Sequence, residues 1–266
     1  MKDMPNRDPW DALRRFTPAR IALGRRGASL PTREVLRFGL AHAQARDAVH
    51  LALDVTALRD ALRPRHGGSI VVHSRAPERA TYLLRPDLGR RLDDASAALL
   101  AEAVAPVSAA PGAAGAPAPP DVAFVVADGL SALAVQRHAA ALLGALVPRL
   151  PPDLIVAPIV IAEQGRVALG DEIGEILGAR LVAVLIGERP GLSSPDSLGV
   201  YLTWAPTRDR SDAERNCVSN IRPEGLGYAA AAMRIAWLMR EARRLQRTGV
   251  GLKDRSDLLE VADDSG

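Results

Sequence analysis

The residues whose types could support chemistry gather in one stretch, residues 187–220, which reads GERPGLSSPDSLGVYLTWAPTRDRSDAERNCVSN. It begins directly after the apolar run LVAVLI (181–186), which is typical of a strand buried on both faces. Glu188 therefore follows the carboxyl end of a strand, where ligands bind in open α/β sheets. The stretch ends near the only cysteine, Cys217, after the strand-like LGVYLTWA and a second polar loop. Two such loops favour one binding site, although residue types alone also allow ordinary surface connections.

The composition is that of a globular protein with room for a sizeable core. The chain has 266 residues, of which 48% are apolar. No apolar run approaches the roughly 20 residues that a membrane span needs, and the charged start, MKDMPNRDPWDALRR, lacks the apolar core of a secretory signal. A single cysteine excludes an internal disulfide framework. We therefore expect a cytoplasmic protein with no membrane contact.

The charges do not indicate a nucleic-acid partner. Lys and Arg number 34 against 31 Asp and Glu, and the arginines are scattered along the chain. Only three each of Phe, Trp and Tyr are available to stack on bases. We therefore expect no nucleic acid among the partners.

Several common catalytic and nucleotide-binding motifs are absent from the sequence. No G-x-G-x-x-G follows a strand-like run and no G-x-x-x-x-G-K-[ST] occurs, which argues against NAD and ATP. No G-x-S-x-G, H-E-x-x-H or C-x-x-C occurs either, and the five histidines do not cluster with carboxylates at ligand spacing. A self-sufficient hydrolase or metalloenzyme is therefore not expected.

Composition divides the chain into three parts. Residues 1–104 are basic and carry mainly helical patterns, whereas residues 105–120, APVSAAPGAAGAPAPP, are uncharged and typical of a linker. Residues 121–266 alternate between strand-like and helical patterns. The prediction is an α/β protein: an N-terminal mainly helical region, a linker, and a C-terminal doubly wound, Rossmann-like domain with a mostly parallel sheet.

Local patterns place the individual elements. In the front, helices are expected over 8–16, 32–53 and 56–62, with Pro64 beyond the last, and strands over SIVVHS (69–74) and TYLLR (81–85). In the back, strands are expected over 123–127, 155–162, 181–186 and 198–205, and helices over 131–147, 171–178 and 226–247.

Several of these segments resemble the small subunit of ethanolamine ammonia-lyase, an adenosylcobalamin-dependent enzyme that converts ethanolamine to acetaldehyde and ammonia. The resemblance extends over residues 8–250. Its most specific segments are TPARIALGRRG, LLRPDLGRRL, VVADGLSA, GDEIGEILGARLVAVLIGERPGL and RNCVSNI. The last two contain the polar residues described first.

The resemblance implies a cofactor, adenosylcobalamin, held between this chain and a large barrel-shaped subunit. The family's cofactor contacts in the small subunit fall on Val167 in GRV, Glu188 in GERPG and Cys217 in NCVSNI. Glu188 could accept from the amides of the corrin rim, Val167 could meet the rim or face, and Cys217 offers a small polarizable contact. The family uses cobalamin with its own dimethylbenzimidazole on cobalt, so no metal ligand is expected from this chain.

The resemblance also places the catalytic residues in the large subunit, so none is assigned here and the chain alone is expected to be inactive. The expected location is the cytoplasm, with a bacterial microcompartment as the second choice. One alternative stays open, namely a non-catalytic α/β binding or regulatory module for another nucleotide-like ligand.

Overall fold

The computed structural model describes residues 9–17, 19–25, 27–66, 68–104 and 118–256. Most of the predicted linker, residues 105–117, lies outside the described residues. The elements, with η marking 3-10 helices, are in chain order η1 (Pro9–Phe16), α1 (Thr32–His50), α2 (Val55–His66), β1 (Ser69–His73), α3 (Arg79–Leu84), η2 (Leu88–Arg90), α4 (Asp94–Val104), β2 (Val122–Ala127), α5 (Ala132–Leu146), η3 (Val147–Arg149), β3 (Ile159–Glu163), α6 (Leu169–Ile176), β4 (Leu181–Gly187), β5 (Leu198–Trp204), η4 (Asp212–Glu214), β6 (Arg215–Ile221), α7 (Tyr228–Leu245) and η5 (Gly249–Gly251).

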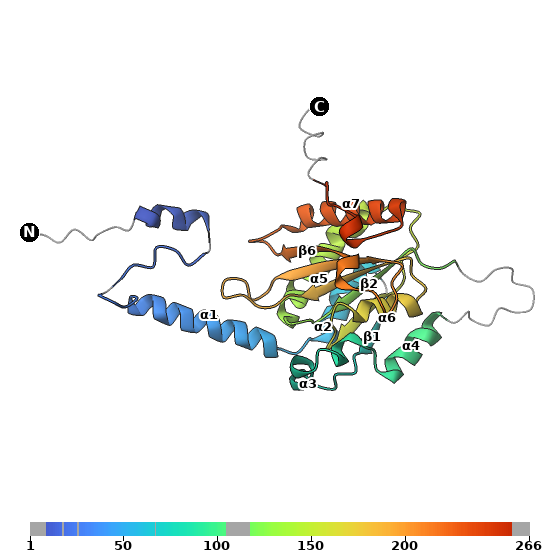
Figure 1. Cartoon of the computed structure of the whole chain (residues 1–266). Coiled ribbons are helices and arrows are strands. Elements are labelled where there is room, and N and C mark those ends of the chain that lie inside the picture. Colours follow the sequence, from blue (N-terminus) through green and yellow to red (C-terminus); the bar gives the residue numbers. More distant parts are fainter. Residues whose placement is uncertain (1–8, 18, 26, 67, 105–117, 257–266) are drawn as a thin grey trace, which may run out of the picture.

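Six strands form one sheet in the order β1-β3-β2-β4-β5-β6 (Figure 1). β1, β3, β2 and β4 are parallel, β5 is antiparallel to β4, and β6 is antiparallel to β5. β6 therefore runs in the direction of the four parallel strands, and all five end at one edge, called the carboxyl edge below. The predicted mixed α/β class is confirmed, and the doubly wound, Rossmann-like arrangement stays a prediction.

Apolar side chains pack against both faces of the sheet. On one face, called the α7 face, residues of α2, α5 and α7 form an apolar cluster that contains Leu142 of α5 and Phe124 of β2. On the other, the α6 face, residues of α4 and α6 pack on Val125 and Val184. Successive residues of β2 and β4 point to opposite faces because side chains alternate along a strand. Both faces are apolar there, which is why continuous apolar runs predict these strands correctly.

Two predictions in the front of the chain are wrong. The segment TYLLR, predicted as a strand, lies largely in α3. Tyr82 is buried there, its hydroxyl donates to the Gly165 carbonyl at 3.2 Å, and the guanidinium groups of Arg79 and Arg166 lie over its ring. Such tertiary contacts override the β propensity of a short apolar run. Pro64 lies inside α2 instead of beyond it, near the end of the helix, where its missing N–H removes one hydrogen bond.

The sequence predicts a polar loop where the structure has β6. Only Arg215, Val218 and Ile221 are buried in this strand, so it lacks an apolar alternation. β6 is the edge strand of the sheet, and on its α6 face the described residues leave Cys217 and Ser219 exposed, so polar residues are tolerated there. The loop prediction is therefore wrong for these residues, and Cys217 lies on a strand.

β1 connects the front of the chain to the back. It pairs with β3 in parallel register from Ser69↔Ile159 to His73↔Glu163. Residues on both sides of the predicted linker thus contribute strands to the same sheet. The division into residues 1–104, 105–120 and 121–266 as separate domains stays a prediction.

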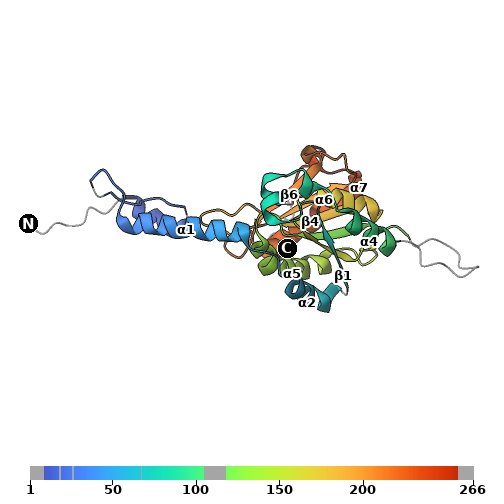
Figure 2. The same cartoon turned by 90° about the horizontal axis from the view of Figure 1, so that it is seen from below.

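α1 projects away from the rest of the molecule, and Figures 1 and 2 show this from two sides. We call the described part of residues 9–50, which includes η1 and α1, the arm. α1 begins at the predicted residue, Thr32, and of its 19 residues only Glu34 and Ala48 are buried. None of the helices in the described ranges is long and apolar enough to cross a membrane.

Candidate cofactor site at the carboxyl edge

Three loops meet at the carboxyl edge of the sheet. Residues 128–131 follow β2, residues 164–168 follow β3, and residues 188–197 follow β4. These strands are immediate neighbours, so their carboxyl ends lie side by side. The predicted residues Val167 and Glu188 belong to two of the three loops, which is the placement expected for a ligand site in an open sheet.

Two glycines allow the loops after β2 and β4 to touch. Gly129 has a φ of 58°, in the left-handed region that favours glycine. The Leu130 N–H donates to the Gly187 carbonyl at 2.9 Å. A Cβ on Gly187 would lie 2.0 Å from the Ser131 carbonyl oxygen, so only glycine fits. The glycines of VVADG and GERPG thus permit a close approach of the two loops, which fixes the backbone position from which the Glu188 side chain extends.

Asp128 ties the loop after β2 to the loop after β3. Its carboxylate accepts from the backbone N–H groups of Gln164 and Gly165, each at 3.0 Å. Burial raises the pKa of Asp128 to about 6, and the positive charge of Arg79, 3.6 Å away, opposes this rise. Gln164 has a φ of 53°, which is uncommon for a residue with a side chain. The carboxylate therefore stabilises the turn that leads to Val167.

Arg79 joins this edge to the arm. Its Nε donates to the Val49 carbonyl in α1 at 2.6 Å, and its Nη1 donates to the Gly129 carbonyl at 2.8 Å and to Gln164 Oε1 at 3.3 Å. Its guanidinium also lies 4.7 Å from the centre of the Tyr82 ring. One largely buried cation thus fixes the end of α1 against the loops after β2 and β3.

Glu188 lies half-buried against β5 and β6. Its Oε2 accepts from the Ser197 hydroxyl at 2.5 Å and from the Asn220 backbone N–H at 3.3 Å. Asn220 has a φ of 57° and lies at a bulge in the pairing of β5 with β6, a feature that redirects backbone groups. A Cβ on Gly199 would lie 2.8 Å from Oε1. Hydrogen bonds from the chain therefore hold Oε2 of Glu188. Oε1 lies over Gly199, which has no side chain to displace it.

Cys217 is exposed on β6 and directly opposite Tyr201 of β5. Desolvation raises the pKa of the Cys217 thiol, a hydrogen bond with Tyr201 opposes the rise, and the charge of Glu188 adds to it. Burial, Cys217 and Glu188 likewise raise the pKa of Tyr201. Both groups stay protonated near neutral pH, so the thiol can form a contact but is not a thiolate nucleophile.

Val167 lies on the same face of the sheet as these groups. It is half-buried and packs on the apolar cluster of the α6 face, to which Tyr201 also belongs. β2 and β4 separate the loop after β3 from β5. The structure thus brings Glu188 and Cys217 together through Tyr201, and it places Val167 along the same edge but on a different loop.

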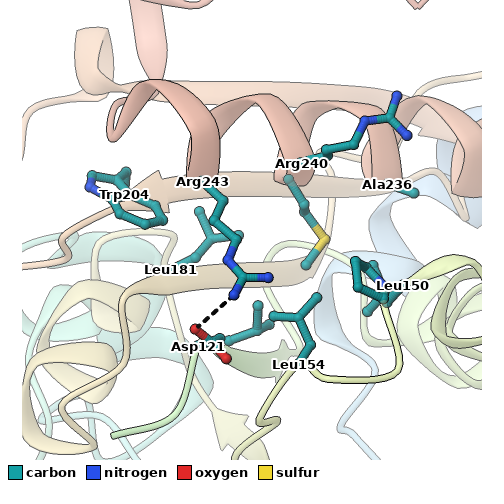
Figure 3. Close-up of a pocket in the computed structure, with 11 residues that line it drawn as sticks. Asp121, Leu150, Leu154, Leu181, Trp204, Ala236, Arg240 and Arg243 are labelled. Atoms are coloured by element: carbon teal, nitrogen blue, oxygen red, sulfur yellow. Dashed lines mark ion pairs between the residues drawn. The ribbon is translucent and has the colours of Figure 1, made fainter.

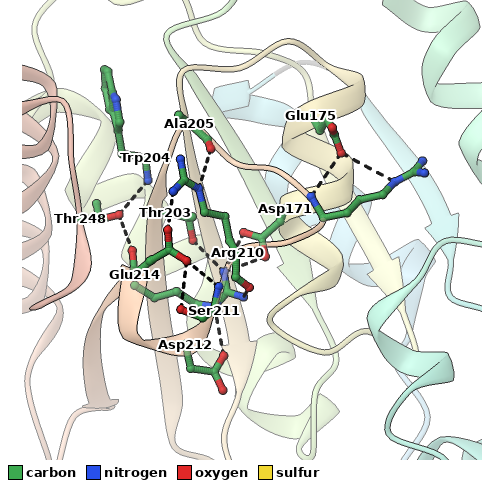
Figure 4. Close-up of polar contacts among 12 residues, drawn as sticks. Asp171, Glu175, Thr203, Trp204, Ala205, Arg210, Ser211, Asp212, Glu214 and Thr248 are labelled. Carbon is green, nitrogen blue, oxygen red and sulfur yellow. Dashed lines mark hydrogen bonds and ion pairs between the residues drawn. The ribbon is translucent and has the colours of Figure 1, made fainter.

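A buried ion pair covers the other end of the α6 face, at the amino end of β6. Arg215 Nη1 donates to both carboxylate oxygens of Asp171, at 2.8 and 2.7 Å, and to Thr203 Oγ1 at 3.3 Å. The side chains of Arg215 and Asp171 are only 3% and 1% exposed. Figure 4 shows the polar contacts that surround this pair at the amino end of β6. The pair joins α6 to β6 and leaves the part of the face near Tyr201 and Cys217 open.

A small pocket lies at the opposite, amino edge of the sheet. Its volume is about 70 Å³, whereas sites for sizeable ligands enclose roughly 300 Å³ or more. The pocket therefore cannot hold a corrinoid, and the predicted site residues lie elsewhere. Its lining includes the following residues, with Arg243 4.0 Å from Asp121 (Figure 3): Asp121, Leu150, Leu154, Leu181, Trp204, Ala236, Met239, Arg240 and Arg243.

Sequence reasoning includes Asn220 in the stretch of interest but misses three residues that surround Glu188 and Cys217, namely Ser197, Gly199 and Tyr201. Tyr201 could have been noticed from the sequence, because it is the one tyrosine in the strand-like run LGVYLTWA. Asn220 belongs to RNCVSNI, one of the segments that resemble the family. Ser197 and Gly199 have no such signal, since they meet Glu188 only because β5 returns antiparallel to β4.

Comparison with known proteins identifies the family. The family model described as ethanolamine ammonia-lyase light chain matches residues 7–253. Two proteins named ethanolamine ammonia-lyase small subunit, from Ralstonia nicotianae and Azotobacter vinelandii, are each 57% identical over 252 residues, which cover 94% of this chain and 90% of the relative. The protein of the same name from Pseudomonas paraeruginosa is 54% identical over 266 residues, covering 100% of this chain and 94% of its own. The chain therefore belongs to the ethanolamine ammonia-lyase light-chain family.

Proposed function

We propose that this chain is the small subunit of an adenosylcobalamin-dependent ethanolamine ammonia-lyase, which converts ethanolamine to acetaldehyde and ammonia, and that its carboxyl edge contacts the cofactor. The observation that supports the proposal most is the placement of Glu188, with one oxygen held by the chain and the other over Gly199, beside Cys217 on an open sheet face. Val167, Glu188 and Cys217 are the proposed contacts. No residue of this chain is proposed to be catalytic.

The residue types at this edge suit a corrinoid. Glu188 can accept hydrogen bonds from amide groups on the rim of the macrocycle, while the protonated Cys217 and Tyr201 can donate. Gly199 has no side chain and so leaves room for the Glu188 carboxylate above it, and Val167 adds an apolar surface on the same face. When bound, adenosylcobalamin supplies a radical by homolysis of its cobalt–carbon bond, so the task of this chain is to bind and orient it.

The proposal includes a large subunit as partner, in keeping with the word small in the names of the relatives. An edge that is open on one face can cover one side of a large ligand, and the large subunit would cover the other and carry the catalytic groups. The chain by itself is therefore proposed to be inactive. The proposed location is the cytoplasm, with a microcompartment as second choice.

The decisive experiment replaces Glu188 in the assembled enzyme. Glu188→Ala, co-expressed with the large subunit, leaves a donor on the cofactor unpaired, which costs about 1–3 kcal/mol or roughly a 5- to 150-fold loss of cofactor affinity. Glu188→Gln should lose less, because its carbonyl still accepts. Turnover at saturating adenosylcobalamin should stay unchanged. The measurement is a titration of activity with cofactor.

Glu241→Ala on α7 serves as the matched control, because Glu241 pairs with Arg244 in the last turns of that helix, at the end farther from the carboxyl edge. It should leave the cofactor constant unchanged. An intact complex of Glu188→Ala with the wild-type constant would contradict the assignment. A wild-type complex that shows no activity with any cobalamin would favour the binding-module alternative.

A further inference from the structure

We propose that the arm is the main docking element for the large subunit and that it inserts into an apolar groove with an acidic rim. The inference rests on the proposed function, which supplies the partner, and it adds the surface and its chemistry. Four features of the described residues support it: exposed apolar side chains, a helix with little packing of its own, an excess of arginine, and attachment at the carboxyl edge.

Large apolar side chains are concentrated on the arm and the turn that follows it. Of the 15 exposed large apolar residues in the described ranges, nine fall within residues 10–51. On α1, Leu36 is 69% exposed and Leu40 60%, while Val35 is 52% and Phe38 47% exposed. A concentration of exposed apolar side chains of this kind is typical of an interaction site.

The apolar residues of α1 lie around much of the helix and not along one narrow stripe. Leu36 and Leu40 are four residues apart and share one side, whereas Val35 and Phe38 share another. A helix that is apolar on several sides is normally buried on several sides. The shape that fits the arm is therefore a groove that encloses it, and a flat surface would cover only one of these pairs.

α1 gains little stability from the body of the molecule. Its 19 residues bury only Glu34 and Ala48. Helices in proteins owe most of their stability to the packing of an apolar face against other elements. A partner that covers Leu36 and Leu40 would supply the packing that the chain itself does not provide.

The arm is basic. Its described residues include seven arginines and three acids. The Glu34 carboxylate, 3% exposed, lies 3.1 Å from Arg37, 3.2 Å from Arg33 and 4.0 Å from Arg14, and its backbone carbonyl accepts from Arg20 at 3.1 Å. One carboxylate thus holds several cations together. An acidic rim complements this charge, whereas a second copy of the same basic arm would place like charges together.

The arm leaves the body at the carboxyl edge. Arg79 ties Val49, near the end of α1, to Gly129 and Gln164 in the loops after β2 and β3. Figures 1 and 2 show α1 extending outward from the body. A partner that covers the open face near Glu188 can therefore reach the arm as well, which is why the large subunit is the occupant proposed here.

The test measures binding of the full chain to the large subunit from the same source. The double variant Leu36→Ser with Leu40→Ser should weaken the complex at least about 30-fold, because central apolar contacts at interfaces each contribute roughly 1–2 kcal/mol or more. Reversal of charge at Arg33 and Arg37 to glutamate should weaken it less and mainly at low salt. The matched control replaces Leu84 and Val250, which are 80% and 74% exposed on the body, with serine.

The control should bind within about twofold of wild type, and circular dichroism of each free variant should match the unmodified chain, since substitutions at exposed positions change stability little. Wild-type affinity of the arm variant would overturn the inference. A free chain that dimerises through the arm, with unchanged binding to the large subunit, would overturn it in favour of a second copy. Failure of the wild-type chain to bind the large subunit would instead refute the proposed function and the inference with it.

Discussion

The two faces of the strand pair β5–β6 differ in how far the described residues cover them. On the α7 face, five apolar residues of the two strands are buried against α5 and α7, namely Leu198, Val200, Leu202, Val218 and Ile221. On the α6 face, the same strands carry a glycine, a half-buried tyrosine, an exposed cysteine and an exposed serine toward the carboxyl edge, namely Gly199, Tyr201, Cys217 and Ser219.

This difference shows which surface of the strand pair the chain covers with its own side chains. Apolar side chains cover the α7 face, and the Arg215–Asp171 pair covers the end of the α6 face that is farther from Glu188. Only the portion next to Glu188 lacks a cover among the described elements. A strand pair that is fully packed on one side and open and polar on the other is suited to rigid presentation of ligand contacts.

The largest effect is expected on the packed face. Leu202 is 0% exposed, and Leu202→Ala should lower the free energy of unfolding by about 2–5 kcal/mol, because it removes apolar contacts and leaves a cavity. Ser219→Ala, on the open face, should change it by no more than about 0.5 kcal/mol. Denaturant unfolding of the isolated chain measures both. Equal losses for the two variants would break the comparison, since both faces would then be packed.

A pH experiment tests whether the loops beside the open face are fixed by buried polar groups. Burial raises the pKa of Asp128 to about 6, from a usual value of about 3.9. The folded state thus binds the proton more tightly than the unfolded state. The stabilisation from this group is fully present below about pH 4 and is lost as the pH rises through 6.

Asp128→Asn removes this titration. The difference in unfolding free energy, wild type minus variant, should therefore fall by up to about 3 kcal/mol between pH 4 and pH 7. Asp209→Asn, at an exposed position, is the control and should give a nearly constant difference. A constant difference for Asp128→Asn would mean that the carboxylate is solvated and that the loops after β2 and β3 are less firmly tied than the hydrogen bonds indicate.

The packed face is the part that the sequence predicts well. Continuous apolar runs identify β2 and β4, and the helix predicted over 131–147 is α5, which Ser131 caps by accepting from the Ala134 N–H at 3.3 Å. α7 also lies within its predicted range. In each case burial and local capping leave a periodic or chemical signal in neighbouring residues.

The open face is the part that the sequence predicts poorly. β6 carries a buried arginine, a cysteine and polar residues, so its strand character comes from pairing with β5 and not from its own pattern. The positions of Ser197 and Gly199 beside Glu188 depend on the same antiparallel return. Long-range pairing sets these contacts, and periodicity within one segment does not encode them. Residue types and strand ends indicate the stretch that contains Glu188 and Cys217, whereas Val167 comes only from resemblance to the family. The role of all three as cofactor contacts also comes from that resemblance and stays a prediction.

The smallest expected effect sharpens the comparison most, because it concerns a single added methyl group on the open face. A Cβ at position 199 would lie 2.8 Å from Glu188 Oε1 and 3.1 Å from its Cγ. Such contacts are too close, so Gly199→Ala must displace the Glu188 side chain while leaving the packed face untouched. In the assembled enzyme the cofactor affinity should fall about fivefold, equivalent to about 1 kcal/mol. Gly227→Ala, where nothing lies within 4 Å of the added atom, is the control and should leave the affinity unchanged.

Gly199 and Glu188 should also be coupled. If the methyl group acts only by moving the carboxylate, Gly199→Ala will cause no further loss in a chain that already carries Glu188→Ala. Additive losses would show that the methyl group obstructs the ligand directly, and no loss in either background would mean that this part of the open face does not meet the cofactor.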